Sequence, residues 1–181
     1  MHGSPLRPAV FLDRDGTIVE DRGHLADPSE VAFYPDTVAA LDRLQKHFLL
    51  FLVTNQPWVA RGVLTLEQVD RVNAWIVSHL AEQGVVITAV YVCPHERSDG
   101  CVCIKPNPHF LYQAAAEHGV DLRRSFTVGD HPHDVEFARS VGARGVYVRT
   151  GHGSKHLPDL PPATVVAAGI GEAADWILRN L

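Results

Sequence analysis

Short apolar segments alternate with amphipathic segments along this chain, and this alternation constrains the fold more than any other feature. The apolar segments, which have the length and composition of buried strands, are residues 9–12, 49–53, 85–92, 125–128, 145–148 and 165–166. The amphipathic segments, which have helical spacing, are residues 36–47, 65–83, 108–118, 134–141 and 172–181. Continuous apolar strands between helices are typical of a mainly parallel sheet covered on both faces. We therefore expect an α/β fold in three layers.

Length and charge restrict the organisation and the partners of the chain. Its 181 residues show no linker or repeat, which predicts one domain over residues 1–181, with residues 151–162 as a surface loop. A net charge of −5 argues against general binding of nucleic acids or membrane surfaces, because these are polyanionic. A small anionic metabolite is still a suitable partner. Residues 1–5 lack the apolar core of a signal peptide, so we expect a cytoplasmic protein.

Polar clusters follow three of the predicted strands at the point where each strand ends. In chain order, the clusters are Asp13-Arg14-Asp15, Thr54-Asn55-Gln56 and Gly129-Asp130. The carboxyl ends of the strands in an open α/β sheet converge on one crevice, where ligands bind. We therefore expect these clusters to meet at a single site, although they are far apart in the sequence.

Asp13 and Asp15 flank a single residue directly after a buried strand. A carboxylate can attack phosphorus and form an aspartyl-phosphate. A second carboxyl group two residues away can protonate the leaving oxygen and then activate water. Both aspartates would also help to hold Mg²⁺, which prefers oxygen ligands, and Gly16 allows the backbone to turn closely past a substrate. A turn in which an aspartate caps the next element is the alternative interpretation.

Four further polar residues are candidates for the same site. The Thr54 hydroxyl could bind phosphoryl oxygens, and Lys105 could neutralise a transferring phosphate. Asp130 follows a strand and a glycine, so its carboxylate could be a third metal ligand. Asp134 either caps the following helix or supports the metal. The alternatives for Thr54 and Lys105 are a strand-end cap and a solvated surface lysine.

A compact group of metal-ligand residues lies in the segment 93–103. It contains every cysteine of the chain and one histidine, namely Cys93, His95, Cys101 and Cys103. Three thiolates and an imidazole suit tetrahedral Zn²⁺, whereas an odd, clustered set of cysteines is a poor disulfide framework. We therefore predict a structural zinc site that folds this loop. Free buried thiols and a redox-sensing site are the alternatives.

Four motifs together resemble one enzyme family, the haloacid dehalogenase-like phosphatases. In the family's order, and over most of the chain, they are F-L-D-R-D-G-T (11–17), V-T-N-Q (53–56), I-K-P (104–106) and V-G-D-x-x-x-D (128–134). The resemblance implies a Rossmann-like fold with Asp13 as nucleophile and Asp15 as acid/base. It further implies that Thr54 and Lys105 contact the phosphoryl group. Mg²⁺ is then expected on Asp13, the Asp15 backbone carbonyl and Asp130.

The zinc loop narrows this resemblance to a subgroup without a cap domain, which includes phosphatases of D-glycero-D-manno-heptose 1,7-bisphosphate and of histidinol phosphate. The segments 21–24, 59–62 and 148–151 are similar to the heptose enzymes, so the resemblance favours that substrate. Histidinol phosphate and other small monoesters are alternatives, as is a non-catalytic phosphate-binding module. The residues that the resemblance places at the substrate are Asp21, Arg22, Gly23, His24, Asn55, Gln56 and Arg61. The alternatives are that Arg61 lies on a surface loop and that His24 is an exposed or structural histidine.

The sequence departs from the family's pattern beside the motif lysine and after T-N-Q. Ile104 stands where the family usually has an arginine, so a bidentate anion donor is missing and recognition of a second phosphate is open. Pro57 and Trp58 replace a usual Ser-Gly pair. His131 and His133 could contact phosphate, or they could be exposed or structural histidines. Because the sequence has no inserted cap domain, we expect an open site. Separately, we expect the protein to be a monomer.

Overall fold

Six strands form one parallel sheet within residues 5–181, the part of the chain that this computed structural model describes. The strands are β1 (Ala9–Leu12), β2 (Leu49–Asn55), β3 (Ala89–Cys93), β4 (Phe126–Gly129), β5 (Arg144–Val148) and β6 (Val165–Ala167). Their order across the sheet is β3-β2-β1-β4-β5-β6, which is the order of a Rossmann-like fold. Residues 1–4, on which the expectation about a signal peptide partly rests, lie outside the described residues.

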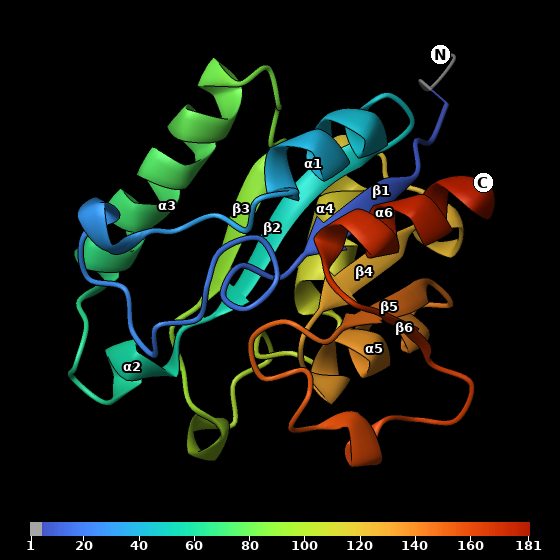
Figure 1. Cartoon of the computed structure of the whole chain (residues 1–181). Helices are drawn as coiled ribbons and strands as arrows, with labels where there is room; N and C mark the ends of the chain where they lie inside the picture. Colours follow the sequence, from blue (N-terminus) through green and yellow to red (C-terminus); the bar gives the residue numbers. More distant parts are fainter. Residues whose placement is uncertain (1–4) are drawn as a thin grey trace.

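Helices cover both faces of this sheet (Figure 1). On one face lie α1 (Thr37–Gln45), α3 (Leu66–Glu82) and α6 (Ile170–Arg179); on the other lie α4 (His109–His118) and α5 (Pro132–Arg139). The predicted three-layer α/β fold is confirmed. Apart from these helices, the connections within residues 5–181 contain no inserted domain and carry only short helical turns. These turns are α2 (Pro57–Ala60), η1 (Pro28–Glu30), η2 (Arg97–Asp99), η3 (Leu122–Arg124) and η4 (Leu157–Asp159).

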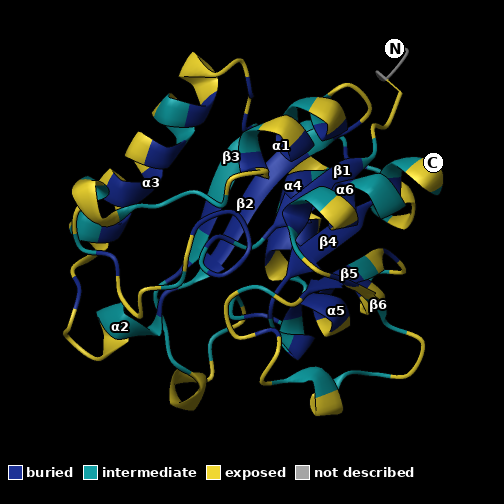
Figure 2. Cartoon of the chain, viewed as in Figure 1, coloured by how far each residue is buried: buried dark blue, intermediate teal, exposed yellow. Residues whose placement is uncertain are grey.

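The central strand β1 is buried on both sides, which explains its continuous apolar sequence. Val10 and Leu12 belong to the core beneath α1, α3 and α6, whereas Ala9 and Phe11 belong to the core beneath α4 and α5. Figure 2 shows the central strands β1, β2 and β4 as mostly buried segments, whereas the edge strand β3 is largely of intermediate exposure. Across residues 5–181, no helix has both the length and the apolar character needed to cross a bilayer.

Two strand predictions differ from the structure near the sheet edge. Thr54 and Asn55 lie inside β2 rather than after it, because both pair in register with β3. Residues 85–88 were expected in a strand, but β3 begins only at Ala89. The physical reason is local: the Val86 amide donates to the Gln45 side chain at 2.9 Å instead of to a neighbouring strand.

The helix α5 begins two residues earlier than the apolar spacing predicts. Its first residue is Pro132, which suits the first helical position because its missing N–H would have no intrahelical partner there. His131 and Asp134 close a reciprocal cap around this start. The early start fixes the backbone directly after Asp130, at the carboxyl end of β4.

Candidate active site

A cavity of about 600 Å³ opens at the carboxyl ends of β1, β2 and β4. It lies at the point where the strand order reverses, which is where open α/β sheets bind their ligands. Ten of the residues predicted at the site line this cavity: Asp13, Asp15, Asp21, Gly23, Thr54, Asn55, Gln56, Arg61, Lys105 and Asp130. The convergence of the strand-end clusters, expected from the topology, is therefore observed.

Arg22 and His24 do not line the cavity, although they lie in the same predicted substrate segment. Arg22 is exposed and forms an ion pair of 3.1 Å with Glu20. The His24 ring lies 5.6 Å from the ring of Trp58. The segment turns tightly at Gly23, whose amide donates to Asp21 Oδ1 at 2.7 Å, and this turn presents only Asp21 and Gly23 to the cavity.

Lys105 is the buried cation at the centre of the site. Its Nζ donates to Asp13 Oδ1 at 2.7 Å, to Asp134 Oδ1 at 2.7 Å and to the Val53 carbonyl at 2.9 Å. The backbone amide of Lys105 donates to Asn55 Oδ1 at 3.2 Å, so the end of β2 holds the lysine segment in place. The ammonium group is thereby fixed beside the predicted nucleophile.

Burial controls the charge state of the carboxylates around Lys105. Burial raises the pKa of Asp13 to about 7, with Lys105 acting in the opposite direction. Burial, followed by the charges of Asp13 and Asp134, raises the pKa of Asp130 to about 8. Burial alone would lower the pKa of Lys105, but the charges of Asp13 and Asp134 more than offset it and raise this pKa above its ordinary value. Lys105 thus pairs with the partly buried Asp13 and the buried Asp134, while the buried Asp130 has no ion pair with it.

This excess of negative charge suits a divalent cation. Asp13, Asp130 and Asp134 each place a carboxylate oxygen within 4.8 Å of the others. Hard cations such as Mg²⁺ take oxygen ligands of this kind. Both carboxylate oxygens of Asp134 already accept hydrogen bonds, one from Lys105 and the other from the His131 amide. Within residues 5–181, Asp13 accepts only through Oδ1. The carboxylates of Asp13 and Asp130 are therefore the better fit for metal ligands.

Two glycines form the cradle that holds Asp130. Gly16 has φ +78° and Gly151 has φ +56°, and a Cβ atom at either position would collide with the Asp130 carboxylate. The backbone amide of His152 donates to Asp130 Oδ2 at 2.7 Å. The predicted need for a close backbone approach at Gly16 therefore has a specific origin, which is contact with Asp130.

Asp134 caps the following helix, which is one of the two roles that the sequence left open, and it also contacts Lys105. Its Oδ2 accepts from the backbone amide of His131 at 3.2 Å, which caps α5. Its Oδ1 accepts from Lys105. One buried side chain therefore couples the start of α5 to the lysine beside Asp13.

Asp15 is held by Gln56, which was predicted at the site, and by Arg14, which was given no role in it. Arg14 is 1% exposed, and its Nη2 donates to Asp15 Oδ2 at 2.8 Å while its Nη1 donates to Asn73 Oδ1 at 2.8 Å. Gln56 Nε2 donates to Asp15 Oδ2 and to Thr54 Oγ1, each at 2.8 Å. An arginine between two aspartates at a buried strand end is the signal that could have identified Arg14.

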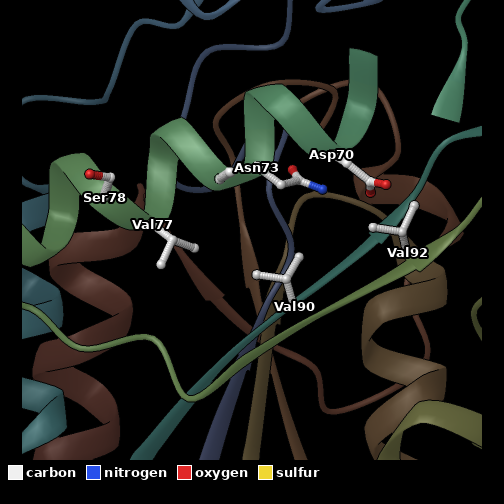
Figure 3. Close-up of a pocket in the computed structure, with 7 residues that line it drawn as sticks. Asp70, Asn73, Val77, Ser78, Val90 and Val92 are labelled. Atoms are coloured by element: carbon white, nitrogen blue, oxygen red, sulfur yellow. The ribbon is translucent and has the colours of Figure 1, made fainter. Parts of the chain in front are cut away.

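A second recess of about 440 Å³ lies between α3 and β3, next to Asn73. Figure 3 shows Asp70 and Asn73 projecting from α3, with Val90 and Val92 on the strand side. Its lining is mainly aliphatic and includes one carboxylate. The chemistry-bearing residues are instead gathered in the cavity that contains Asp13.

Five more basic or imidazole groups line the active-site cavity: Arg61, Arg97, His131, His133 and His152. Arg61 pairs with Glu96 at 2.9 Å and lies over the ring of Trp58. Arg97 Nη2 lies 2.6 Å from Nε2 of His133. The pKa of His133 is lowered to about 4, first by burial and then by the neighbouring His131 and Arg97 charges, so this imidazole is neutral near pH 7.

The predicted zinc ligands converge on one point. The Sγ atoms of Cys93, Cys101 and Cys103 lie 3.2–3.7 Å apart, and His95 Nδ1 lies 3.4 Å from Cys103 Sγ. A Zn–S distance of about 2.3 Å implies sulfur separations of about 3.8 Å in a tetrahedron. The four donor atoms therefore have the composition of a structural zinc site, and their sulfur separations lie somewhat below the spacing in such a tetrahedron.

Comparison with known proteins identifies the same family that the four sequence motifs indicate. A family profile described as HAD-hydrolase-like matches residues 102–173. The D-glycero-beta-D-manno-heptose-1,7-bisphosphate 7-phosphatase of Yersinia pestis is 38% identical over 184 residues, covering 96% of this chain and 91% of that protein. A probable D-glycero-D-manno-heptose-1,7-bisphosphate 7-phosphatase of Thermoplasma volcanium is 39% identical over 134 residues, covering 73% of this chain and 92% of that protein.

A solved structure extends the similarity to three dimensions. The D,D-heptose 1.7-bisphosphate phosphatase from B. bronchiseptica, complexed with magnesium and phosphate, matches with a TM-score of 0.87. The two chains are 32% identical, and the match covers 96% of this chain and 99% of that one. The family resemblance read from the four motifs is confirmed. This chain belongs to the haloacid dehalogenase-like hydrolases, and it is a phosphatase.

Proposed function

We propose that this protein is a magnesium-dependent phosphatase that removes the 7-phosphate of D-glycero-D-manno-heptose 1,7-bisphosphate through an aspartyl-phosphate on Asp13. The observation that carries the proposal is the pairing of Asp13 with Lys105 at the floor of the cavity, beside Asp130. The substrate follows from the relatives named above, which match this chain over most of their length.

In the first half of the reaction, Asp13 is the nucleophile. Lys105 holds Oδ1, which leaves Oδ2 to attack phosphorus as the bond from phosphorus to the sugar oxygen breaks. Asp15 donates a proton to that leaving oxygen. The Lys105 ammonium and the Thr54 hydroxyl line the same cavity. The three N–H groups of Lys105 are held by Asp13, Asp134 and the Val53 carbonyl, so the lysine stabilises the phosphoryl oxygens through its charge, and the Thr54 hydroxyl can donate to them.

In the second half, water replaces the sugar. Asp15, now ionised, takes a proton from water, and the water oxygen attacks phosphorus. The bond between phosphorus and Asp13 breaks, which releases inorganic phosphate and restores the Asp13 carboxylate. Arg14 and Gln56 keep Asp15 pointed at the cavity through both halves.

Two metal ions have matching ligand sets in this chain. Mg²⁺ would be held by the Asp13 and Asp130 carboxylates and by the Asp15 backbone carbonyl, and when bound it would supply neutralisation of phosphate charge. Zn²⁺ would be held by Cys93, His95, Cys101 and Cys103, and it would fold the loop that precedes Lys105.

The test is phosphate release from purified protein with Mg²⁺, on a panel that includes the heptose bisphosphate, histidinol phosphate and simple monoesters. We expect the heptose bisphosphate to have the highest kcat/KM. The Asp13→Asn variant should lose at least about 10³-fold in kcat, because an amide is a poor nucleophile. Full activity of that variant would contradict the mechanism, and a clear preference for histidinol phosphate would contradict the substrate.

A further inference from the structure

Arg97 differs from the other cationic side chains that line the active-site cavity. Lys105 is paired with Asp13 and Asp134, and Arg61 is paired with Glu96. Arg97, at the first position of η2, contacts ring nitrogens of His133 at 2.6 and 2.8 Å. Among residues 5–181, no carboxylate lies within ion-pair distance of its guanidinium group, so its positive charge is not neutralised locally.

The surroundings of Arg97 hold it at the cavity rim. The His133 imidazole contacts the Arg97 guanidinium group through a ring nitrogen. The His133 ring also stacks on the His131 ring at a centroid distance of 4.2 Å. His131 in turn packs against His156 at 4.6 Å. A single Nη atom of Arg97 makes the contact with His133, which leaves the other guanidinium donors for a ligand.

The cavity connects this guanidinium group to the reaction centre. Asp13 and Lys105 line the floor, Arg97 and His133 line the rim, and Ile104 adds an apolar wall. The volume of about 600 Å³ is within the range of small-molecule sites. A sugar whose phosphate rests on Asp13 can therefore direct a second polar group toward the rim.

We propose that Arg97, positioned by His133, binds a second anionic group on the substrate and so selects bisphosphorylated sugars over monophosphates. A guanidinium fork matches phosphate oxygens in two parallel hydrogen bonds, and a neutral imidazole acceptor orients the fork without cancelling its charge. This inference rests on the proposed function, since it names the part of the same site that reads the non-reacting end of the substrate.

The kinetic test compares heptose 1,7-bisphosphate with heptose 7-phosphate, which carries the reacting phosphate alone. Arg97→Gln should lower kcat/KM for the bisphosphate by about 10- to 100-fold and leave the monophosphate within about 2-fold. Arg97→Lys should recover part of the loss, because it keeps the charge but not the fork. Arg123→Gln, the same change on η3 before β4, should leave both substrates unchanged.

His133→Phe tests positioning, because it keeps a ring against His131 and removes the acceptor. It should cause a smaller loss on the bisphosphate alone, and the double variant with Arg97→Gln should lose no more than Arg97→Gln itself. Additive losses would contradict the positioning role of His133. Equal losses on both sugars, or no loss on either, would overturn the role of Arg97.

Failure of the proposed function would give a different result. If the protein releases no phosphate from the heptose sugars, calorimetric titration of the Asp13→Asn variant with fructose 1,6-bisphosphate and fructose 6-phosphate replaces the kinetic comparison. Tighter binding of the bisphosphate that disappears with Arg97→Gln would support the anion site even though the named substrate was wrong. Equal affinity for the two sugars would overturn it.

Discussion

Asp130 illustrates how a single residue in this site depends on the backbone around it. Its carboxylate is packed between Gly16 and Gly151, which come from the β1 and β5 ends of the sheet, and it accepts from the His152 amide. Neither glycine could be replaced without moving the carboxylate. The position of the predicted metal ligand is therefore fixed by main-chain contacts as much as by its own side chain.

This arrangement gives a prediction with a matched control. Gly16→Ala and Gly84→Ala both place alanine at a similar positive φ, +78° and +82°, which should cost each variant about 1–2 kcal/mol of stability. The space around them differs, because a Cβ atom at Gly84 meets nothing within 4 Å. We expect Gly16→Ala to lose magnesium-dependent activity by at least 10-fold and Gly84→Ala to retain it. Thermal melting and phosphate release measure the two effects, and equal activity of the variants would contradict this explanation.

Some residues of the site can be predicted from the sequence and others cannot. The difference depends on whether a residue lies at a strand end or meets a partner that is distant in the sequence. Asp13 and Asp130 directly follow strands, and Thr54 is the last residue but one of β2, so topology alone brings them together. Arg14 and Asn73 meet across 59 positions of sequence through a hydrogen bond that no local pattern encodes. Arg97 and His133 likewise meet across 36 positions. Pairings of this kind require the folded backbone, and so the sequence alone did not assign them.

At the scale of elements, the segment between β3 and α4 joins the predicted zinc ligands to the predicted catalytic lysine. It begins at Cys93 in β3, carries Arg97 on η2, and ends with Cys103 two residues before Lys105. The four predicted zinc ligands bracket η2. Folding of this segment therefore determines where both the rim arginine and the floor lysine are presented.

We accordingly predict about one zinc ion per chain, and a loss of both stability and activity when it is removed. A Cys101→Ser variant should lack the zinc, melt at a lower temperature and show reduced kcat even with saturating Mg²⁺, because Lys105 and Arg97 lose their support. Elemental analysis, melting and kinetics give the three readouts. A protein purified without zinc that melts unchanged in a strong chelator would refute the prediction.

The elements themselves were largely predictable, and the differences have local causes. Continuous apolar runs identified every strand that is buried on both faces, such as β1. The edge strand β3 was predicted too long, since Val85 is buried like a strand residue while the Val86 amide bonds to a side chain. Hydrophobicity reports burial, and at a sheet edge burial and strand pairing are separate properties.

At the scale of the whole molecule, negative charge is concentrated where an anionic substrate must bind. The chain carries a net charge of −5, and three carboxylates, of which Asp130 and Asp134 are buried and Asp13 is partly buried, lie together at the cavity floor beside Lys105. Without a cation, such a site would repel a phosphate group. The ionisation of the carboxylates and the binding of Mg²⁺ must therefore be linked.

The sign of this linkage follows from the raised pKa values of Asp13, about 7, and Asp130, about 8, in the metal-free protein. Both pKa values exceed the ordinary aspartate value of 3.8, so the folded protein binds more protons than the unfolded protein at pH values between them. The stability of the metal-free protein should therefore fall as the pH rises from about 4 to 8. Mg²⁺ requires the ionised carboxylates, so its affinity should rise by up to about tenfold per pH unit for each proton displaced.

We therefore predict that Mg²⁺ at about 5 mM, in the millimolar range of weak carboxylate sites, raises the melting temperature. This increase should grow between pH 6 and pH 8 and level off above pH 8. The Asp130→Asn variant is the control: it lacks one titrating ligand, so its response to Mg²⁺ should be smaller at every pH. The measurement is a melting series at constant ionic strength, with Ca²⁺-free buffers. A response to Mg²⁺ that is the same at pH 6 and pH 8 would show that Asp13 and Asp130 are already ionised in the metal-free protein, and it would remove the electrostatic basis of the site described above.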